Sequence, residues 1–180
     1  MNEHPSIRDL RYQNQHDPVY AFLDKIPNWL VYGHLSLKNN FQWCEKDRLN
    51  KFHLLIRDLA KRFVGCRDLN AFGWFLREEG NGQDKRFHFH FSLTADNLTR
   101  TTPETVCRYL TKQWGKIAKS SCVIEPWNNT KTALGVWYLT QMDLYPAPHS
   151  RYFHGDNCRW KMSTMLHTRI LQLTKERITE

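Results

Sequence analysis

Two histidines that alternate with phenylalanines are the residues of this chain best suited to chemistry. The stretch Arg86-Phe-His-Phe-His-Phe-Ser-Leu93 splits at period two into an apolar row and a polar row that holds His88 and His90. Because successive side chains leave opposite faces of a β-strand, we expect the phenylalanines in the core and both histidines on the other face. The imidazoles would lie about 7 Å apart, close enough to converge on one metal ion. The alternative is a pair of half-exposed strand histidines without a ligand.

An acidic residue on the preceding strand is expected to complete the site. That strand ends in Glu78-Glu79, and the next six residues, Gly80-Asn-Gly-Gln-Asp-Lys85, have the composition of a turn. If Gly80 and Lys85 close the hairpin, Glu79 pairs with Arg86 and shares a face with the histidines, because paired residues point the same way. A loop one residue different would place Glu78 there instead.

Two imidazoles and one carboxylate form an incomplete coordination set. Such a set leaves positions open for substrate, as a catalytic metal requires. Mixed nitrogen and oxygen ligation suits Mn²⁺ or Mg²⁺ in phosphate chemistry, and Zn²⁺ also binds such groups. The expected cofactor is therefore a divalent metal, Mn²⁺ or Mg²⁺, with His88, His90 and Glu79 as its ligands.

Tyr138 is a second residue with chemical potential, in the stretch Trp137-Tyr-Leu-Thr-Gln141 of an expected helix. Most helical tyrosines pack in a core or an interface. The functional interpretation is a nucleophile, whose phenolate attacks a phosphodiester and holds a covalent phosphotyrosine intermediate. A nearby metal would polarise and orient the scissile phosphate. The residues alone leave both interpretations open.

The elements that must position these residues follow an α+β pattern. They are expected, in chain order, as strand 29–37, helix 47–64, strands 71–79 and 86–94, helix 103–119, strand 122–127, helix 132–142 and a terminal helix 160–177. The first six have the βαββαβ order of a ferredoxin-like fold, an antiparallel sheet with helices on one face and the metal and tyrosine site on the other. That fold hosts many functions, so the site must decide among them.

The charge of the chain indicates which class of partner it binds. The 180 residues carry a formal net charge of +8, which favours a polyanion, either nucleic acid or a membrane surface. No apolar run approaches the roughly 18 residues of a spanning helix, and the N-terminus lacks the apolar core of a signal peptide. We therefore expect nucleic acid and no membrane. Five cysteines without a CxxC pair argue against a disulfide framework and fit a reducing, intracellular setting.

Four stretches together resemble the HUH endonucleases, specifically the single-tyrosine Rep type that initiates rolling-circle replication. They are the strand Leu30–Leu37, the His-hydrophobe-His motif Phe87–Phe91, the acidic strand end Glu78–Asn81 of circovirus-like Reps, and Cys122–Glu125 followed by a polar loop and Tyr138–Gln141. The resemblance covers roughly Trp29–Asp143. It departs from the usual Tyr-x-x-Lys at Gln141, a neutral amide that can bind a phosphate but adds no charge. Lys131 or Arg151 can supply that charge.

The resemblance implies a metal-dependent nickase and strand-transferase that acts on single-stranded or hairpin DNA. Tyr138, assisted by Gln141, would hold the 5′ phosphate covalently and rejoin ends by the reverse reaction. Expected DNA contacts are Arg86, Lys131, Trp127 and Arg151. Trp127 is expected to stack on unpaired bases unless it belongs to the core.

Several alternatives stay open. A single-tyrosine transposase, a DNA-binding module that has lost catalysis, and a metal-dependent nuclease of another mechanism share these features. No Walker-type GxxxxGK[ST] motif occurs, so any helicase would come from another chain. We divide the chain into an N-terminal arm (1–28), the HUH domain (29–145) and a C-terminal extension packed on that domain (146–180). The expected location is the cytoplasm of a prokaryote or, for a viral protein, nucleus or cytoplasm.

Overall fold

The computed structural model describes residues 23, 26, 28–37, 43–80, 87–96, 98, 101–128 and 159–176. Within these ranges the chain is α+β, as expected, with a five-stranded antiparallel sheet and three α-helices. The elements are β1 (Trp29–Ser36), α3 (Glu45–Phe63), the 3₁₀ turn η2 (Leu69–Ala71), β2 (Gly73–Glu79), β3 (His88–Thr94), α4 (Pro103–Ala118), β4 (Cys122–Pro126), β5 (Arg159–Met162) and α6 (Thr164–Glu176). The expected helix 132–142, the arm 1–22 and residues 129–158 lie outside them.

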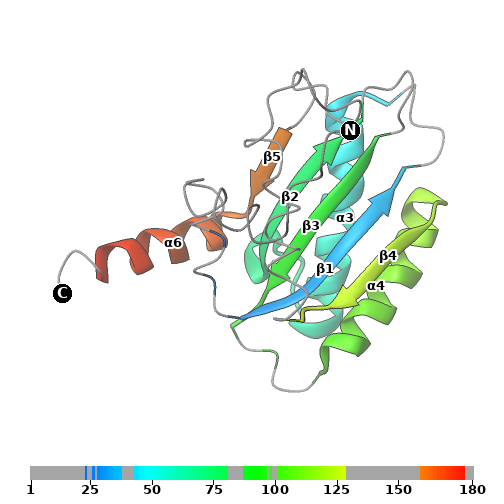
Figure 1. Ribbon diagram of the computed structural model, residues 1–180. Helices are drawn as coiled ribbons and strands as arrows, with labels where there is room; N and C mark the ends of the chain where they lie inside the picture. The colour runs from blue at the N-terminus through cyan, green and yellow to red at the C-terminus, as the bar shows by residue number, and fades with distance from the viewer. Residues whose placement is uncertain are drawn as a thin grey trace, which may run out of the picture.

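The sheet has the strand order β4-β1-β3-β2-β5, so the histidine strand β3 is its middle strand. Helices α3 and α4 cover one face of this sheet (Figure 1). The phenylalanine row lies under them, as predicted. Phe89 and Phe91 are at most 1 % exposed, and their ring centres lie 6.1 and 5.7 Å from that of Phe52 on α3. Each such buried side chain contributes roughly 1.5–3 kcal/mol.

Local signals set the ends of the two helices. Thr102 caps α4 by accepting a hydrogen bond from the Thr105 backbone N–H at 3.3 Å, and Pro103 takes the first helical position, where its missing N–H costs nothing. Helix α3 ends before Gly65, whose φ of +83° is a left-handed conformation that glycine adopts without a steric penalty. These ends hold the helices over the phenylalanine row.

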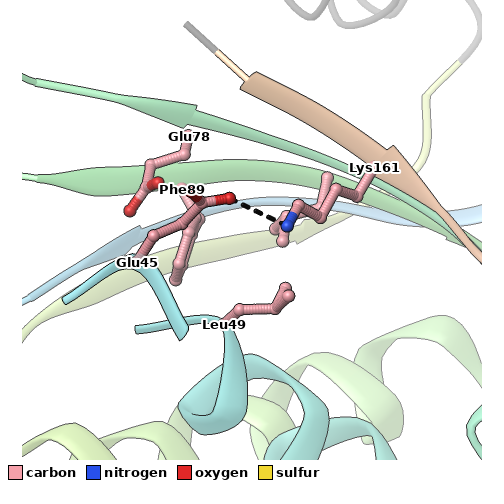
Figure 2. Close-up of a pocket in the computed structure, with 6 residues that line it drawn as sticks. Glu45, Leu49, Glu78, Phe89 and Lys161 are labelled. Atoms are coloured by element: carbon pink, nitrogen blue, oxygen red, sulfur yellow. Dashed lines mark hydrogen bonds and ion pairs between the residues drawn. The ribbon is translucent and has the colours of Figure 1, made fainter. Parts of the chain in front are cut away.

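The expected terminal helix 160–177 is wrong in its first part. Residues Arg159–Met162 form β5, which pairs with the edge of β2, and the helix begins only at Thr164. Ser163 sets this boundary, because its Oγ accepts a hydrogen bond from the Leu166 backbone N–H at 3.2 Å. Lys161 on β5 also forms an ion pair of 2.9 Å with Glu45 at the start of α3, across a small pocket (Figure 2). The new strand thus covers an edge that β2 would otherwise expose.

A second, smaller core lies on the sheet face opposite α3 and α4. Leu166 and Ile170 of α6 pack there with Trp29 and Phe75. These residues occupy the end of the face where β1 begins. The histidines lie toward the other end, where β1 and β2 end and β3 begins.

Candidate metal centre on the sheet face opposite the helices

Three histidines gather on this face. His34 of β1 joins His88 and His90 of β3, and one ligand nitrogen from each lies within 4.8 Å of the other two. The ring centres are 4.9 Å apart for His34 and His88, 5.0 Å for His34 and His90, and 5.1 Å for His88 and His90. Three imidazoles in a nearly equilateral group form a site that can hold a metal ion.

The pairing of β1 with β3 creates this group. His34 is the direct neighbour of His90, and Ser36 is the neighbour of His88. Since paired residues share a face, the polar row of β1 and the polar row of β3 must point the same way. Gly33, next to His34, pairs with Phe91 and leaves room for its ring on the helix side. The apolar packing on one side therefore fixes the imidazoles on the other.

Glu79 of β2 lies beside the histidines. Its Oε2 is 3.4 Å from Nε2 of His88, and its Oε1 is 3.6 Å from Nε2 of His90. The expected register is wrong by two residues, because Glu79 pairs with His88 rather than with Arg86. The loop between the strands is longer than Gly80–Lys85. A register shift of two residues leaves each side chain on the same face of the sheet, so Glu79 lies on the histidine face, as expected.

Glu78 points to the other side of the sheet. It pairs with Phe89 and forms a buried ion pair with Arg48 of α3. The side chain of Glu78 is 7 % exposed and that of Arg48 is 8 % exposed. Glu78 is therefore part of the packing between sheet and helix, and Glu79 is the glutamate on the histidine face.

Arg77 contributes a buried positive charge to the same face. It pairs with His90, its side chain is 1 % exposed, and its guanidinium Nη2 lies 3.0 Å from Oε1 of Glu79. A buried arginine requires a nearby negative charge, which Glu79 supplies. Glu79 is thus shared between Arg77 and the histidines.

The protonation states follow from this environment. Burial opposes the charge of Glu79, but the hydrogen bond with His88 and the charge of Arg77 prevail and lower the pKa of Glu79 to about 2. Burial lowers the pKa of His90 to about 3, although Glu79 acts in the opposite direction. Burial, followed by the neighbouring His88, also lowers the pKa of His34. At neutral pH, Glu79 is therefore ionised, and His34 and His90 are neutral, as metal binding requires.

Tyr32 supports the ring of His90 from the β1 side. Its hydroxyl lies 3.1 Å from Nδ1 of His90, at hydrogen-bond distance. A hydrogen bond at one ring nitrogen of a ligating histidine fixes the orientation of the other. Nδ1 of His90 thus faces Tyr32, and Nε2, which lies 3.6 Å from Oε1 of Glu79, is the nitrogen directed toward the site.

Trp127 is the one described residue among the expected DNA contacts. It follows β4, it is half-buried, and its ring centre lies 5.5 Å from that of Trp29 in the second core. The core interpretation therefore fits Trp127 better than base stacking. The nucleophile candidate Tyr138, its neighbour Gln141, and the expected DNA contacts Arg86, Lys131 and Arg151 lie outside the described residues.

His34 is the site residue that sequence reasoning missed. It was visible only as a member of the polar row of β1, between Tyr32 and Ser36. A period-two row shows which residues share a face but not which strand lies alongside. The signal that could have found it is the fold itself, because a sheet that places β1 beside β3 brings the two polar rows together.

Two further observations complete the description. None of the helices in the described part of the chain is both long and apolar enough to cross a membrane. Comparison with protein-family models gives no match, and comparison with curated proteins gives none either. The function must therefore be inferred from the geometry of the site.

Proposed function

We propose that this chain is a metal-dependent enzyme that nicks and rejoins single-stranded or hairpin DNA. The observation that carries the proposal is the group of His34, His88 and His90, with ligand atoms within 4.8 Å of one another on the sheet face opposite the helices. The strand order β4-β1-β3-β2 and the chain order β1-α3-β2-β3-α4-β4 support a ferredoxin-like framework for it.

The ligand set favours some ions over others. Imidazole nitrogens suit Zn²⁺ and the later first-row metals best, and Mn²⁺, itself a first-row transition metal, accepts them more readily than Mg²⁺, which prefers oxygen ligands and octahedral geometry. His34, His88 and His90 would hold the ion, and Glu79, whose carboxylate oxygens lie 3.4 Å from Nε2 of His88 and 3.6 Å from Nε2 of His90, would add an oxygen ligand. Of the two ions expected from the sequence, Mn²⁺ is therefore the better match.

The electrostatics of the site suit a phosphodiester. Arg77 already balances the charge of Glu79, and His34 and His90 are neutral at physiological pH. A bound divalent ion would leave the site with a net positive charge that an anionic phosphate can neutralise. Such an ion supplies Lewis-acid polarisation of the phosphate and stabilises the charge that develops during its displacement.

The nucleophile in this proposal is Tyr138. Its phenolate oxygen forms a bond to phosphorus while the bond from phosphorus to the 3′ oxygen breaks. The 3′ oxygen takes up a proton and leaves as a hydroxyl, and the 5′ phosphate stays on the tyrosine. Attack by a 3′ hydroxyl reverses these changes and reseals the strand. The net charge of +8 supplies affinity for phosphates that does not depend on sequence.

A labelled pool of hairpins with randomised single-stranded loops tests the proposal. With Mn²⁺ present, we expect a covalent protein–DNA species on a denaturing gel, absent for Tyr138→Phe and for His88→Ala. His167→Ala is the matched control, because His167 is an exposed histidine on α6. An adduct from Tyr138→Phe at the wild-type rate would show that the nucleophile is another residue.

Two other functions give different outcomes in the same assay. A transposase of the same chemistry would also join the bound end to a second DNA, so joined products of two substrates would identify it. A module that only binds DNA would retain DNA without metal and form no adduct. The three-imidazole group argues against the binding module, since His34 and His90 are neutral at physiological pH and add little to phosphate affinity.

A further inference from the structure

We propose that the outer face of α4 is a docking surface for the phosphate backbone of double-stranded DNA. This face lies on the helix side of the sheet, away from the histidines, and is therefore a second surface beyond the proposed nicking site (Figure 1). It presents an exposed row that consists of Arg108, Lys112, Gly115, Lys116 and Lys119. Below we call these five residues the α4 row.

The charge of the α4 row is concentrated and of one sign. Residues 103–119 contain four basic residues and one acidic residue, Glu104, which lies one turn before Arg108. Arg108, Lys112 and Lys116 follow one another at intervals of four residues. This spacing places three cations on one side of the helix at steps of about 6 Å. A straight row of cations is complementary to the regular charge of a duplex backbone.

The row lowers the stability of the helix that carries it. Lys112 has a like charge four residues away on either side, Arg108 and Lys116, and such pairs destabilise a helix. The helix dipole favours cations only in the last turn, where Lys116 lies, so it does not explain Lys112. Arg108 has a partner in the Thr105 hydroxyl, to which its Nη2 donates at 3.3 Å, so Lys112 is the cation for which helix stability gives no reason.

Two backbone features of the α4 row add to this cost. Gly115 lies in the helix interior and is exposed, and apart from the surrounding backbone of α4 and the two adjacent residues no atom lies within 4 Å of the position that a Cβ would occupy there. Packing therefore does not require the glycine, which weakens the helix relative to any ordinary residue. Lys119 ends the helix at a φ of +50°, in the left-handed region that favours glycine. The absence of a side chain at Gly115 allows a ligand to approach the helix surface closely between Lys112 and Lys119.

The absence of exposed rings on the α4 row indicates a duplex rather than a single strand. Single-stranded DNA is bound by base stacking on aromatic side chains in addition to phosphate contacts. The large rings of α4 are directed elsewhere. Trp114 is fully buried, and the hydroxyl of the half-buried Tyr109 donates to the backbone oxygen of Asp58 at 3.1 Å. The α4 row thus offers contacts to a backbone and none to a base.

The test is fluorescence anisotropy with a blunt DNA duplex of about 20 base pairs, over a salt series and in EDTA. The α4 variant combines Arg108→Gln, Lys112→Gln and Lys116→Gln. The matched control removes the same charge from exposed positions of α3, with Lys46→Gln, Arg57→Gln and Lys61→Gln. We expect the α4 variant to lose at least about tenfold in affinity and to reduce the slope of log K against log salt by about 2–3, whereas the control changes the slope by less than about 1. Equal losses in both variants, or no loss in the α4 variant, would overturn the proposal.

A second variant separates binding from folding. Gly115→Gln replaces the glycine by a good helix former, so we expect the melting temperature to rise by about 2–4 °C while duplex affinity falls. A more stable protein that binds the duplex as tightly as wild type would contradict the proposal. His88→Ala is expected to bind the duplex like wild type, which keeps this result independent of the nicking activity. Duplex binding with no nicking, or nicking with no duplex binding, can therefore be told apart.

Discussion

Replacement of His34 by alanine tests the metal centre at the residue on which the structure and the sequence-based prediction differ. The sequence predicted a ligand set of His88, His90 and Glu79, whereas the structure groups His34 with the two histidines of β3. If three imidazoles hold the ion, His34→Ala removes one of three protein ligands. Changes in the second shell alone typically cost 10–100-fold in metal affinity, so we expect a loss of at least about 100-fold.

The expected magnitude in a thermal melt follows from mass action. A free metal concentration of 100 times the wild-type Kd stabilises the native state by about 2.7 kcal/mol. A protein of this size gains about 2–4 °C per kcal/mol, so the wild type should gain roughly 5–10 °C. For His34→Ala the same concentration is about equal to Kd. Its stabilisation is then about 0.4 kcal/mol, or roughly 1 °C.

The assay is a melt of each variant with and without Mn²⁺ and Co²⁺, and Co²⁺ also reports its ligands through its visible absorption. His53→Ala is the matched control, since His53 is a half-buried histidine of α3 on the other side of the sheet, with its ring centre 5.7 Å from that of Trp74. It should keep the full metal-dependent shift. A full shift in His34→Ala together with a lost shift in Glu79→Gln would refute the three-imidazole set and restore the one predicted from the sequence.

Three further outcomes follow from the packing and charge around the site. Gly33→Ala places a Cβ 2.2 Å from Cε1 of the buried Phe91, so we expect a loss of about 1–3 kcal/mol in urea unfolding, partly recovered when Phe91→Leu is added. Because the pKa of His90 is lowered to about 3, the unfolded chain binds a proton below about pH 6.5 that the native chain does not. The free energy of unfolding should therefore fall as the pH drops below 6.5, on the order of 1 kcal/mol per pH unit, and His90→Gln should flatten this slope. Below about pH 4.5 the unfolded chain also takes up a proton at Glu79, whose native pKa is about 2, and this adds to the loss. Glu78→Ala leaves the buried guanidinium of Arg48 without its carboxylate and should lower the free energy of unfolding in urea by about 3–5 kcal/mol. The metal affinity of the folded variant, measured by a metal titration, should equal that of the wild type.

Local alternation explains what the sequence predicted well. The rows of residues 86–93 indicated that Phe89 and Phe91 are buried and that His88 and His90 share the other face, because the direction of a strand side chain depends on no distant contact. The expected face of Glu79 survived a register error of two residues for the same reason, since only an odd shift would move it to the helix side.

Non-local pairing explains what the sequence did not predict. His34 becomes part of the site only because β1 pairs with β3, and no pattern within the sequence of β1 predicts which strand it pairs with. The expected helix 160–177 includes Trp160–Met162 because so short a segment carries little periodicity. These residues belong to strand β5 because β2 offers an unpaired edge and Ser163 caps the helix that follows. The burial of Arg77 likewise depends on Glu79 being fixed nearby by the same sheet.

Anomalous diffraction from crystals soaked in Mn²⁺ or Co²⁺ tests the metal centre most directly, because it locates the ion without reference to activity. We predict one strong peak bounded by His34, His88 and His90, and no such peak in His88→Ala. A peak elsewhere on the molecule, or none between these three imidazoles at saturating metal, would contradict the metal centre and the nicking function proposed from it.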